Sequence, residues 1–115
     1  GHNPPYLLRG GQDEPILLTD GGPVVGMLPP MLVKYSQGEI QLKPGDLIVG
    51  FTDGISEAMN PKDEEWGEEA LLAKLQTILD KSPTEIHDAC VAGADAFANG
   101  AKQHDDMTMI AVRVL

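Results

Sequence analysis

The spacing of apolar residues changes near the middle of this 115-residue chain, and that change most constrains its fold. Before residue 60 the apolar runs are short and end at Gly or Pro, which is typical of strands joined by turns. From residue 67 onward apolar residues recur three or four positions apart, which is the period of an amphipathic helix. The length suits one domain and leaves no room for two. We therefore expect a single α+β unit, residues 1–115.

Strands are expected in the first half and again at the C-terminus. The apolar runs predict strands at 6–9, 16–19, 46–52 and 107–114, and a hairpin formed by 32–35 and 39–42. In the strand at 46–52, Leu47, Ile48 and Val49 are apolar at successive positions. This pattern predicts a strand that is buried on both faces.

Two amphipathic helices are expected in the second half. The first should cover 67–80, where leucines and isoleucines recur at helical spacing. The second should begin at Ser82, which can cap the helix while Glu85 completes a capping box. Asn99 and Gly100 are residues that end helices.

The charge balance excludes several classes of partner. The formal net charge is −10, and no cluster of Lys and Arg offsets it. Such a surface repels phosphate backbones and anionic lipids, so we expect no contact with nucleic acid or membrane. The only cysteine, Cys90, cannot form an internal disulfide, which fits a cytoplasmic protein. It falls on the apolar stripe of the second helix and should be a core residue, not a nucleophile. Because the chain opens with Gly1, it is expected to be a piece of a longer protein.

Two acidic positions stand apart from the general surface charge. Asp53 directly follows the most apolar strand, and Gly54 allows a sharp turn there. Asp105 and Asp106 precede the last strand. If those two strands run antiparallel, the aspartates share one edge of the sheet and repel each other. A hard divalent cation such as Mg²⁺ or Mn²⁺ would relieve that repulsion.

The same residues also have a purely structural interpretation. Asp-Gly is a common turn pair, and aspartate often caps an element, so the residues alone leave both interpretations open. A calcium EF-hand is excluded because the residues after Asp53 lack the alternating acidic pattern. A zinc site is disfavoured by one Cys and three scattered His residues.

Four short motifs occur in a characteristic order along the chain. They are Gly1-His2-Asn3-Pro4-Pro5, Leu42-Lys43-Pro44-Gly45-Asp46-Leu47, Thr52-Asp53-Gly54-Ile55-Ser56-Glu57-Ala58 and Asp105-Asp106-Met107-Thr108. Their order and spacing resemble the C-terminal half of the catalytic domain in the SpoIIE/RsbU-type branch of the PPM (type 2C) metal-dependent protein phosphatases. Each motif is weak alone, but the four together cover nearly the whole chain.

The resemblance implies a fold, an activity and a set of site residues. It implies part of an αββα four-layer sandwich with mostly antiparallel strands, and two Mn²⁺ or Mg²⁺ ions that activate water against phosphoserine or phosphothreonine. Asp53 and Asp105 would be metal ligands. Gly54 and Asp106 would hold these ligands in place without binding the metal themselves, and His2 and Asn3 would lie close to the site.

The resemblance also implies what this piece lacks. In the family an upstream Asp-Gly motif and a further acidic ligand complete the metal site, and neither has a counterpart here. We therefore expect the isolated chain to bind Mg²⁺ or Mn²⁺ weakly, to hydrolyse nothing, and to self-associate through exposed sheet surfaces.

Three functions remain open at this point. The first is a bacterial regulatory phosphatase acting on a phosphoprotein, in this branch typically an anti-sigma-factor antagonist. The second is a non-catalytic interaction module that keeps the fold. The third is a plain acidic α/β domain whose aspartates only shape turns.

Overall fold

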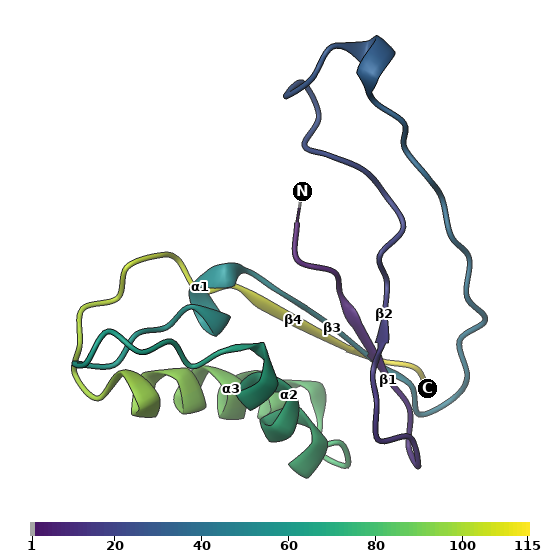
Figure 1. The fold of residues 1–115 in the computed structure, drawn as a ribbon. Coiled ribbons are helices and arrows are strands. Elements are labelled where there is room, and N and C mark those ends of the chain that lie inside the picture. Colours follow the sequence, from purple (N-terminus) through teal and green to yellow (C-terminus); the bar gives the residue numbers. More distant parts are fainter. Residues whose placement is uncertain (1) are drawn as a thin grey trace.

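The chain forms one antiparallel sheet with helices packed on one of its faces and a long arm that projects from the sheet (Figure 1). The structure, a computed structural model, describes residues 2–115; Gly1 of the Gly-His-Asn-Pro-Pro segment lies outside the described residues. The strands are β1 (Tyr6–Leu8), β2 (Ile16–Leu17), β3 (Leu47–Phe51) and β4 (Met109–Arg113), in the order β2-β1-β3-β4. Every pairing is antiparallel, so the predicted α+β class is confirmed.

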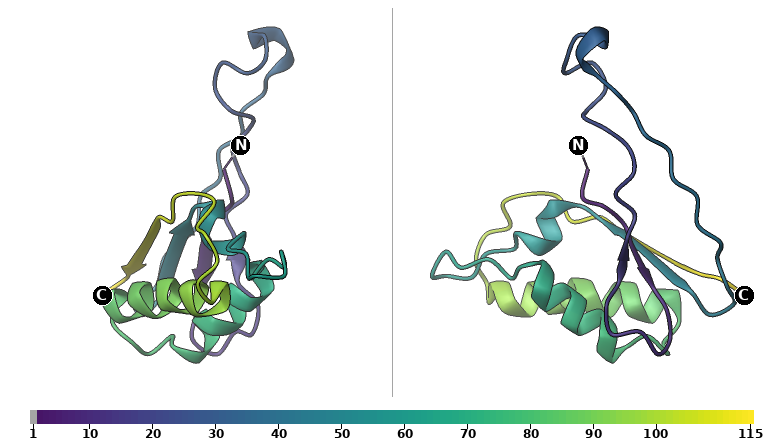
Figure 2. Two further views of the ribbon diagram at one scale, coloured as in Figure 1. Left: turned by 90° about the vertical axis from the view of Figure 1, so that its left-hand side faces the viewer. Right: turned by 45° about the vertical axis from the view of Figure 1, so that its right-hand side comes forward.

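The helices cover only one face of this sheet, as both views in Figure 2 show. Along β3, Leu47, Val49 and Phe51 are buried, whereas Ile48 and Gly50 are only partly buried. The prediction that this strand is buried on both faces is therefore wrong. Within residues 2–115 no second layer covers the outer face, so the described chain supplies one sheet and one helical layer of the expected four-layer sandwich.

Two longer helices form the layer beneath the sheet. They are α2 (Glu68–Thr77) and α3 (Pro83–Ala98), which confirms both predicted helices with slightly shorter bounds. At the start of α3, the Ser82 hydroxyl accepts a hydrogen bond from the Glu85 amide at 3.2 Å. The Glu85 carboxylate accepts one from the Ser82 amide at 2.9 Å, which completes the capping box. Asn99 ends the helix with a left-handed backbone, φ 48°.

The hydrophobic core lies between the sheet and these helices. Leu47 and Val49 from β3 meet Leu71 and Leu75 from α2, and Cys90 from α3, all with no exposed surface. Burial raises the pKa of the Cys90 thiol to about 11. Cys90 is therefore a core residue, as its place on the apolar stripe predicted.

Residues 18–42 leave the sheet and return to it as an extended arm (Figure 1). The predicted hairpin of 32–35 and 39–42 does not form there, and the arm contains only a 3₁₀ turn, η1 (Pro30–Leu32). Its two sides are joined where the Ser36 amide donates to the Gly21 carbonyl at 2.8 Å and the Gly21 amide donates to the Ser36 hydroxyl at 3.0 Å. A two-stranded ribbon without a covering layer is marginal in water, which explains why the strand pattern forms no ladder.

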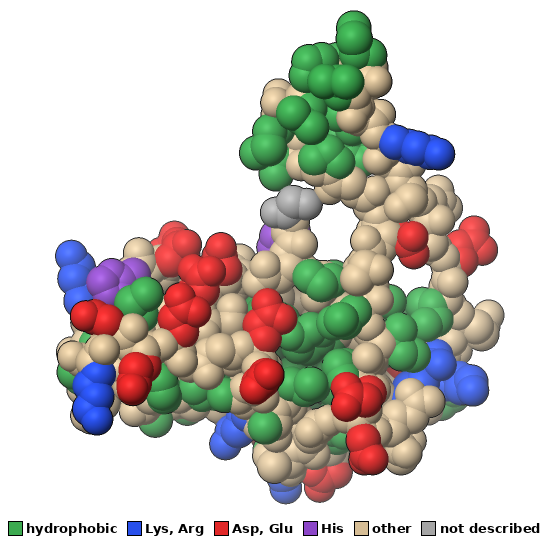
Figure 3. Space-filling view, viewed as in Figure 1, with side chains coloured by type: hydrophobic (Ala, Val, Ile, Leu, Met, Phe, Trp, Pro, Cys, Tyr) green, Lys and Arg blue, Asp and Glu red, His purple; other side chains and the backbone are tan. Residues whose placement is uncertain are grey.

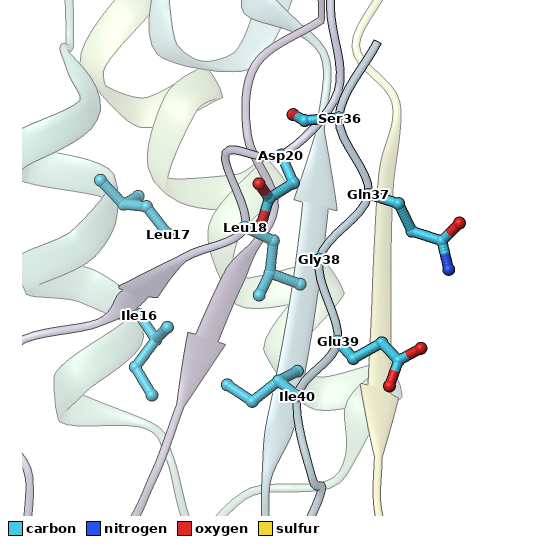
Figure 4. Close-up of a pocket in the computed structure, with 9 residues that line it drawn as sticks. All are labelled: Ile16, Leu17, Leu18, Asp20, Ser36, Gln37, Gly38, Glu39 and Ile40. Atoms are coloured by element: carbon cyan, nitrogen blue, oxygen red, sulfur yellow. The ribbon is translucent and has the colours of Figure 1, made fainter.

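The base of the arm runs past β2 and leaves a hollow of about 600 Å³ between them. The close-up in Figure 4 shows the side chains of Ile16, Leu18 and Ile40 pointing into this space. Gln37 and Glu39 point away from it. The returning segment therefore keeps the side-chain alternation of a strand although it belongs to no sheet.

The tip of the arm, residues 21–33, is apolar and exposed (Figure 3). Val25 is 84% exposed and Met31 89%, and no residue from 21 to 33 carries a charge. The outer face of β4 is also apolar, with Ile110 and Val112 exposed. Exposed apolar patches of this kind usually mark a surface that another part or another molecule covers. Within residues 2–115 no helix is long and apolar enough to cross a membrane.

Candidate metal centre

Asp53 and Asp105 lie at the same end of the sheet. Asp53 directly follows Thr52 at the end of β3, where it begins the short helix α1 (Asp53–Ser56), and Asp105 lies shortly before β4. Because Phe51 of β3 pairs with Met109 of β4, the end of one strand meets the start of the other. Both aspartates are exposed. The antiparallel arrangement on which the predicted site depends is therefore present. The helix α1 was not predicted, since a four-residue turn is too short to show a helical period.

Gly54 lies against the backbone of the segment that carries the second aspartate. A Cβ atom at Gly54 would lie 2.4 Å from the Asp106 carbonyl oxygen and 3.2 Å from that of Asp105. The absence of a side chain thus allows the two motifs to touch. The structure brings Gly54 and the Asp106 backbone together, whereas the supporting role that the resemblance implies for these two residues stays a prediction.

Two threonines join the motifs by hydrogen bonds. The Thr52 amide donates to the Thr108 carbonyl at 3.0 Å, and the Thr108 amide donates to the Thr52 hydroxyl at 2.9 Å. The Thr52 hydroxyl in turn donates to the Asp106 carbonyl at 3.0 Å. The sequence interpretation did not single out these residues. The sequence could have indicated them by position, since Thr52 directly precedes Asp53 and Thr108 is the last residue of the Asp-Asp-Met-Thr motif.

The N-terminal segment runs beside the first aspartate. His2, Asn3, Thr52 and Asp53 line one small hollow of about 140 Å³. The His2 ring nitrogen Nδ1 lies 2.9 Å from the Asn3 carbonyl oxygen. The structure therefore places His2 and Asn3 near Asp53, as the resemblance implied, whereas their role stays a prediction.

Local hydrogen bonds also hold the turn that contains Asp105. The Asp105 carboxylate accepts a hydrogen bond from the Asp106 amide at 2.7 Å, and the Gln103 side chain donates to the Asp105 carbonyl at 2.7 Å. One carboxylate oxygen is thus engaged within the turn. This contact joins residues that are adjacent in the chain, and a local role of this kind in a turn is what the structural interpretation of the aspartate describes. The other oxygen has no hydrogen bond that the described residues record.

The donor set fits a hard cation only in part. Asp53 and Asp105 offer carboxylate oxygens, which Mg²⁺ and Mn²⁺ prefer. The ion pairs recorded among residues 2–115 involve other carboxylates, so no Lys or Arg of the described chain neutralises these two. No group of three or more metal-binding side chains gathers anywhere in residues 2–115. The chain can therefore supply two ligands and needs further ones from elsewhere, and the ligand roles stay predictions.

The chain is similar to known proteins over its whole length. The family described as Stage II sporulation protein E (SpoIIE) matches residues 1–115. The protein IcfG of Synechocystis sp. is 33% identical over 112 residues, which are 97% of this chain and 17% of that protein. The chain therefore spans a small part of this relative.

Solved structures show the same fold. The PP2C phosphatase domain of SpoIIE from Bacillus subtilis, solved with a fragment of its regulatory domain, has a TM-score of 0.73 and 28% identity. The match covers 99% of this chain and 32% of that one. The SiaA-PP2C domain of Pseudomonas aeruginosa has a TM-score of 0.71 at 19% identity, over 100% of this chain and 44% of that one, and shows likeness of fold alone. The agreement of motifs, sheet topology and family match over the full 115 residues shows that this chain belongs to the SpoIIE family.

Proposed function

We propose that this chain is the C-terminal half of a metal-dependent protein phosphatase domain and contributes two aspartate ligands to its metal centre. The observation that carries the proposal is the contact between the Thr-Asp-Gly and Asp-Asp-Met-Thr motifs at one end of the sheet. The similarity to PP2C phosphatase domains supports a phosphatase activity. The chain covers 32% to 48% of the B. subtilis chains, which supports the proposal that the other ligands come from a second half.

The proposed division of roles follows from the residues present. Asp53 and Asp105 would hold Mn²⁺ or Mg²⁺, and the structure of the B. subtilis domain presoaked in Mn supports the choice of ion. The bound ions supply positive charge that neutralises phosphate oxygens and lowers the pKa of water. This supply matters here because the chain has a net charge of −10 and brings no basic cluster of its own to a phosphate group.

The substrate we propose is phosphoserine or phosphothreonine on a regulatory protein in the bacterial cytoplasm, with an anti-sigma-factor antagonist as the partner. The similarity to the B. subtilis cell fate determinant SpoIIE supports a regulatory role. An exposed site at the sheet end also suits a protein substrate better than a small molecule, which usually binds in an enclosed pocket.

The test compares the isolated chain with the complete protein that carries it. We expect the complete protein to release phosphate from a phosphoserine peptide only with Mn²⁺ or Mg²⁺. We expect residues 1–115 alone to bind Mn²⁺ weakly and to release none. Asp53→Asn and Asp105→Asn should each lower the Mn²⁺ affinity of the complete protein by at least tenfold, measured by calorimetric titration, because each removes a charged ligand.

Asp63→Asn is the matched control, since it removes an equal charge from an exposed carboxylate outside the motifs. Equal Mn²⁺ affinity in all three variants would contradict the proposed ligands. Tight Mn²⁺ binding without any hydrolysis of phosphopeptides would favour a non-catalytic module that keeps the fold. No Mn²⁺ binding by the complete protein would leave the aspartates with a purely structural role.

A further inference from the structure

We infer that the Thr52 hydroxyl is a positioning group that holds Asp105 in a fixed place relative to Asp53. The inference rests on the proposed metal-binding function and adds a residue that acts through the ligands without being one. Thr52 immediately precedes Asp53 in the chain, so anything held by its hydroxyl is placed relative to the first aspartate.

The hydroxyl of Thr52 acts both as a donor and as an acceptor toward the Asp-Asp-Met-Thr motif. It accepts from the Thr108 amide at 2.9 Å and donates to the Asp106 carbonyl at 3.0 Å. These two partners lie on the same side of Asp105 in the chain, so the hydroxyl fixes the segment that leads away from the second aspartate. A hydroxyl offers one donor and two acceptor positions, so one group can make both contacts.

The contact at Gly54 explains why this hydrogen bonding has a defined geometry. The carbonyl oxygens of Asp105 and Asp106 close in on the backbone of Gly54, where even a methyl group has no space. The segment is thus pressed against Gly54 on one side and hydrogen-bonded to Thr52 on the other. Thr52 itself is only partly buried. Thr52 and Gly54 are the two chain neighbours of Asp53. Both contacts therefore fix the position of the Asp105 segment relative to Asp53.

The variants Thr52→Val and Thr52→Ser separate the effect of the hydroxyl from that of the side-chain shape. Thr52→Val keeps the branched shape but removes the hydrogen bonds to the Thr108 amide and the Asp106 carbonyl, and because both of these residues are exposed, water can take the place of the hydroxyl without holding the segment in one position. Thr52→Ser keeps the hydroxyl and loses only the methyl group. We expect Thr52→Val to lower the Mn²⁺ affinity of the complete protein by roughly 10-fold, the usual lower bound for groups that orient ligands. Thr52→Ser should restore most of it.

A double-mutant cycle distinguishes positioning from general stability. If Thr52 acts through Asp105, then Thr52→Val should have almost no further effect on Mn²⁺ affinity in an Asp105→Asn background, and the two changes should be non-additive. Nuclear magnetic resonance of the same protein without metal should show the Thr108 amide shifted in Thr52→Val and unshifted in Thr52→Ser. Additive effects of Thr52→Val and Asp105→Asn on the Mn²⁺ affinity would overturn the inference. So would a Thr52→Ser variant that binds Mn²⁺ as weakly as Thr52→Val.

The failure of the inference can be told apart from that of the proposed function. If the wild-type protein binds no Mn²⁺, the metal centre itself is wrong and the positioning role falls with it. If the wild-type protein binds Mn²⁺ and the Thr52→Val variant binds it equally well, the centre stands and only the role of Thr52 is wrong.

Discussion

The Arg9 guanidinium and the Asp46 carboxylate form an ion pair in which the single Nε–H group is shared by both carboxylate oxygens, at 3.1 Å from one and 3.2 Å from the other. Arg9 directly follows β1 and Asp46 directly precedes β3, so the pair joins two neighbouring strands at the end opposite the aspartate site. Arg9 also donates to the Gln41 carbonyl at 2.7 Å, and the Lys43 amide donates to Asp46 at 2.9 Å. The pair therefore fixes the point at which the arm rejoins the sheet.

Stability should fall in acid because of Asp46. Although burial by itself would raise the pKa of this carboxyl, the Lys43 amide and the Arg9 guanidinium hold it below its usual range. A carboxyl with a lower pKa in the folded state stabilises the fold fully above its unfolded pKa, about 3.9. That contribution is lost as the pH falls from there through the lower folded value. Chemical denaturation at a series of pH values should show this loss.

Asp46→Asn should reduce that acid dependence and lower stability at neutral pH. Asp80→Asn is the control, because Asp80 is 79% exposed and its contact with Lys81 is 4.0 Å long. An exposed pair of this kind contributes little. Identical pH profiles for wild type and Asp46→Asn would show that the ion pair does not contribute to acid stability.

Gly54→Ala should destabilise the fold by roughly 1–3 kcal/mol, the usual cost of forcing an extra methyl group into a packed site. The added Cβ would collide with the Asp106 carbonyl, and a backbone atom cannot move aside as the end of a flexible side chain can. Thermal unfolding would measure the change. Gly10→Ala is the matched control, since a Cβ there has nothing within 4 Å. If both variants unfold at the same temperature, the two motifs are not in the contact described.

The Cys90 thiol should not react in the folded protein. It has no exposed surface, and burial raises its pKa to about 11, so the reactive thiolate is scarce at neutral pH. A disulfide reagent at mildly alkaline pH should label it only after unfolding in guanidinium chloride. The phosphatase activity proposed for the complete protein should survive Cys90→Ala. Rapid labelling of the native state would place the thiol at the surface.

The isolated chain should self-associate through the arm tip, residues 21–33, and the outer face of the sheet. The tip is uncharged in a chain of net charge −10, so two copies can approach there with the least repulsion. Sedimentation velocity should show oligomers at high protein concentration. The double variant Val25→Glu, Met31→Glu should shift them to monomer, because it replaces the two most exposed large hydrophobic side chains of the tip with charged ones.

The control for this effect adds the same charge elsewhere. Gln12→Glu with Gln37→Glu introduces two carboxylates at exposed positions outside the tip. If this control dissociates the oligomers equally well, net charge and not the tip governs association. A monomeric wild-type chain at every concentration would refute self-association itself.

The sequence by itself determined the elements whose signals are local. The capping box of Ser82 and Glu85 and the left-handed stop at Asn99 gave the bounds of α3, because a helix end needs only neighbouring residues to satisfy its backbone groups. The helical spacing of apolar residues likewise predicted α2, and an unbroken apolar run predicted the central strand β3. The motif order gave the family, which the match over residues 1–115 then showed.

Only the tertiary structure decided the features that depend on distant residues. The strand-like pattern at 32–35 and 39–42 produced no hairpin, because a two-stranded ribbon is marginal in water when no further layer of the described chain packs on it. Leu47-Ile48-Val49 is apolar throughout, yet its burial depends on which faces other layers cover. The contact of Thr52 with Asp106 and Thr108 spans more than fifty residues. No local pattern encodes such a contact, since it arises only when antiparallel pairing of β3 and β4 brings the two motifs to one edge.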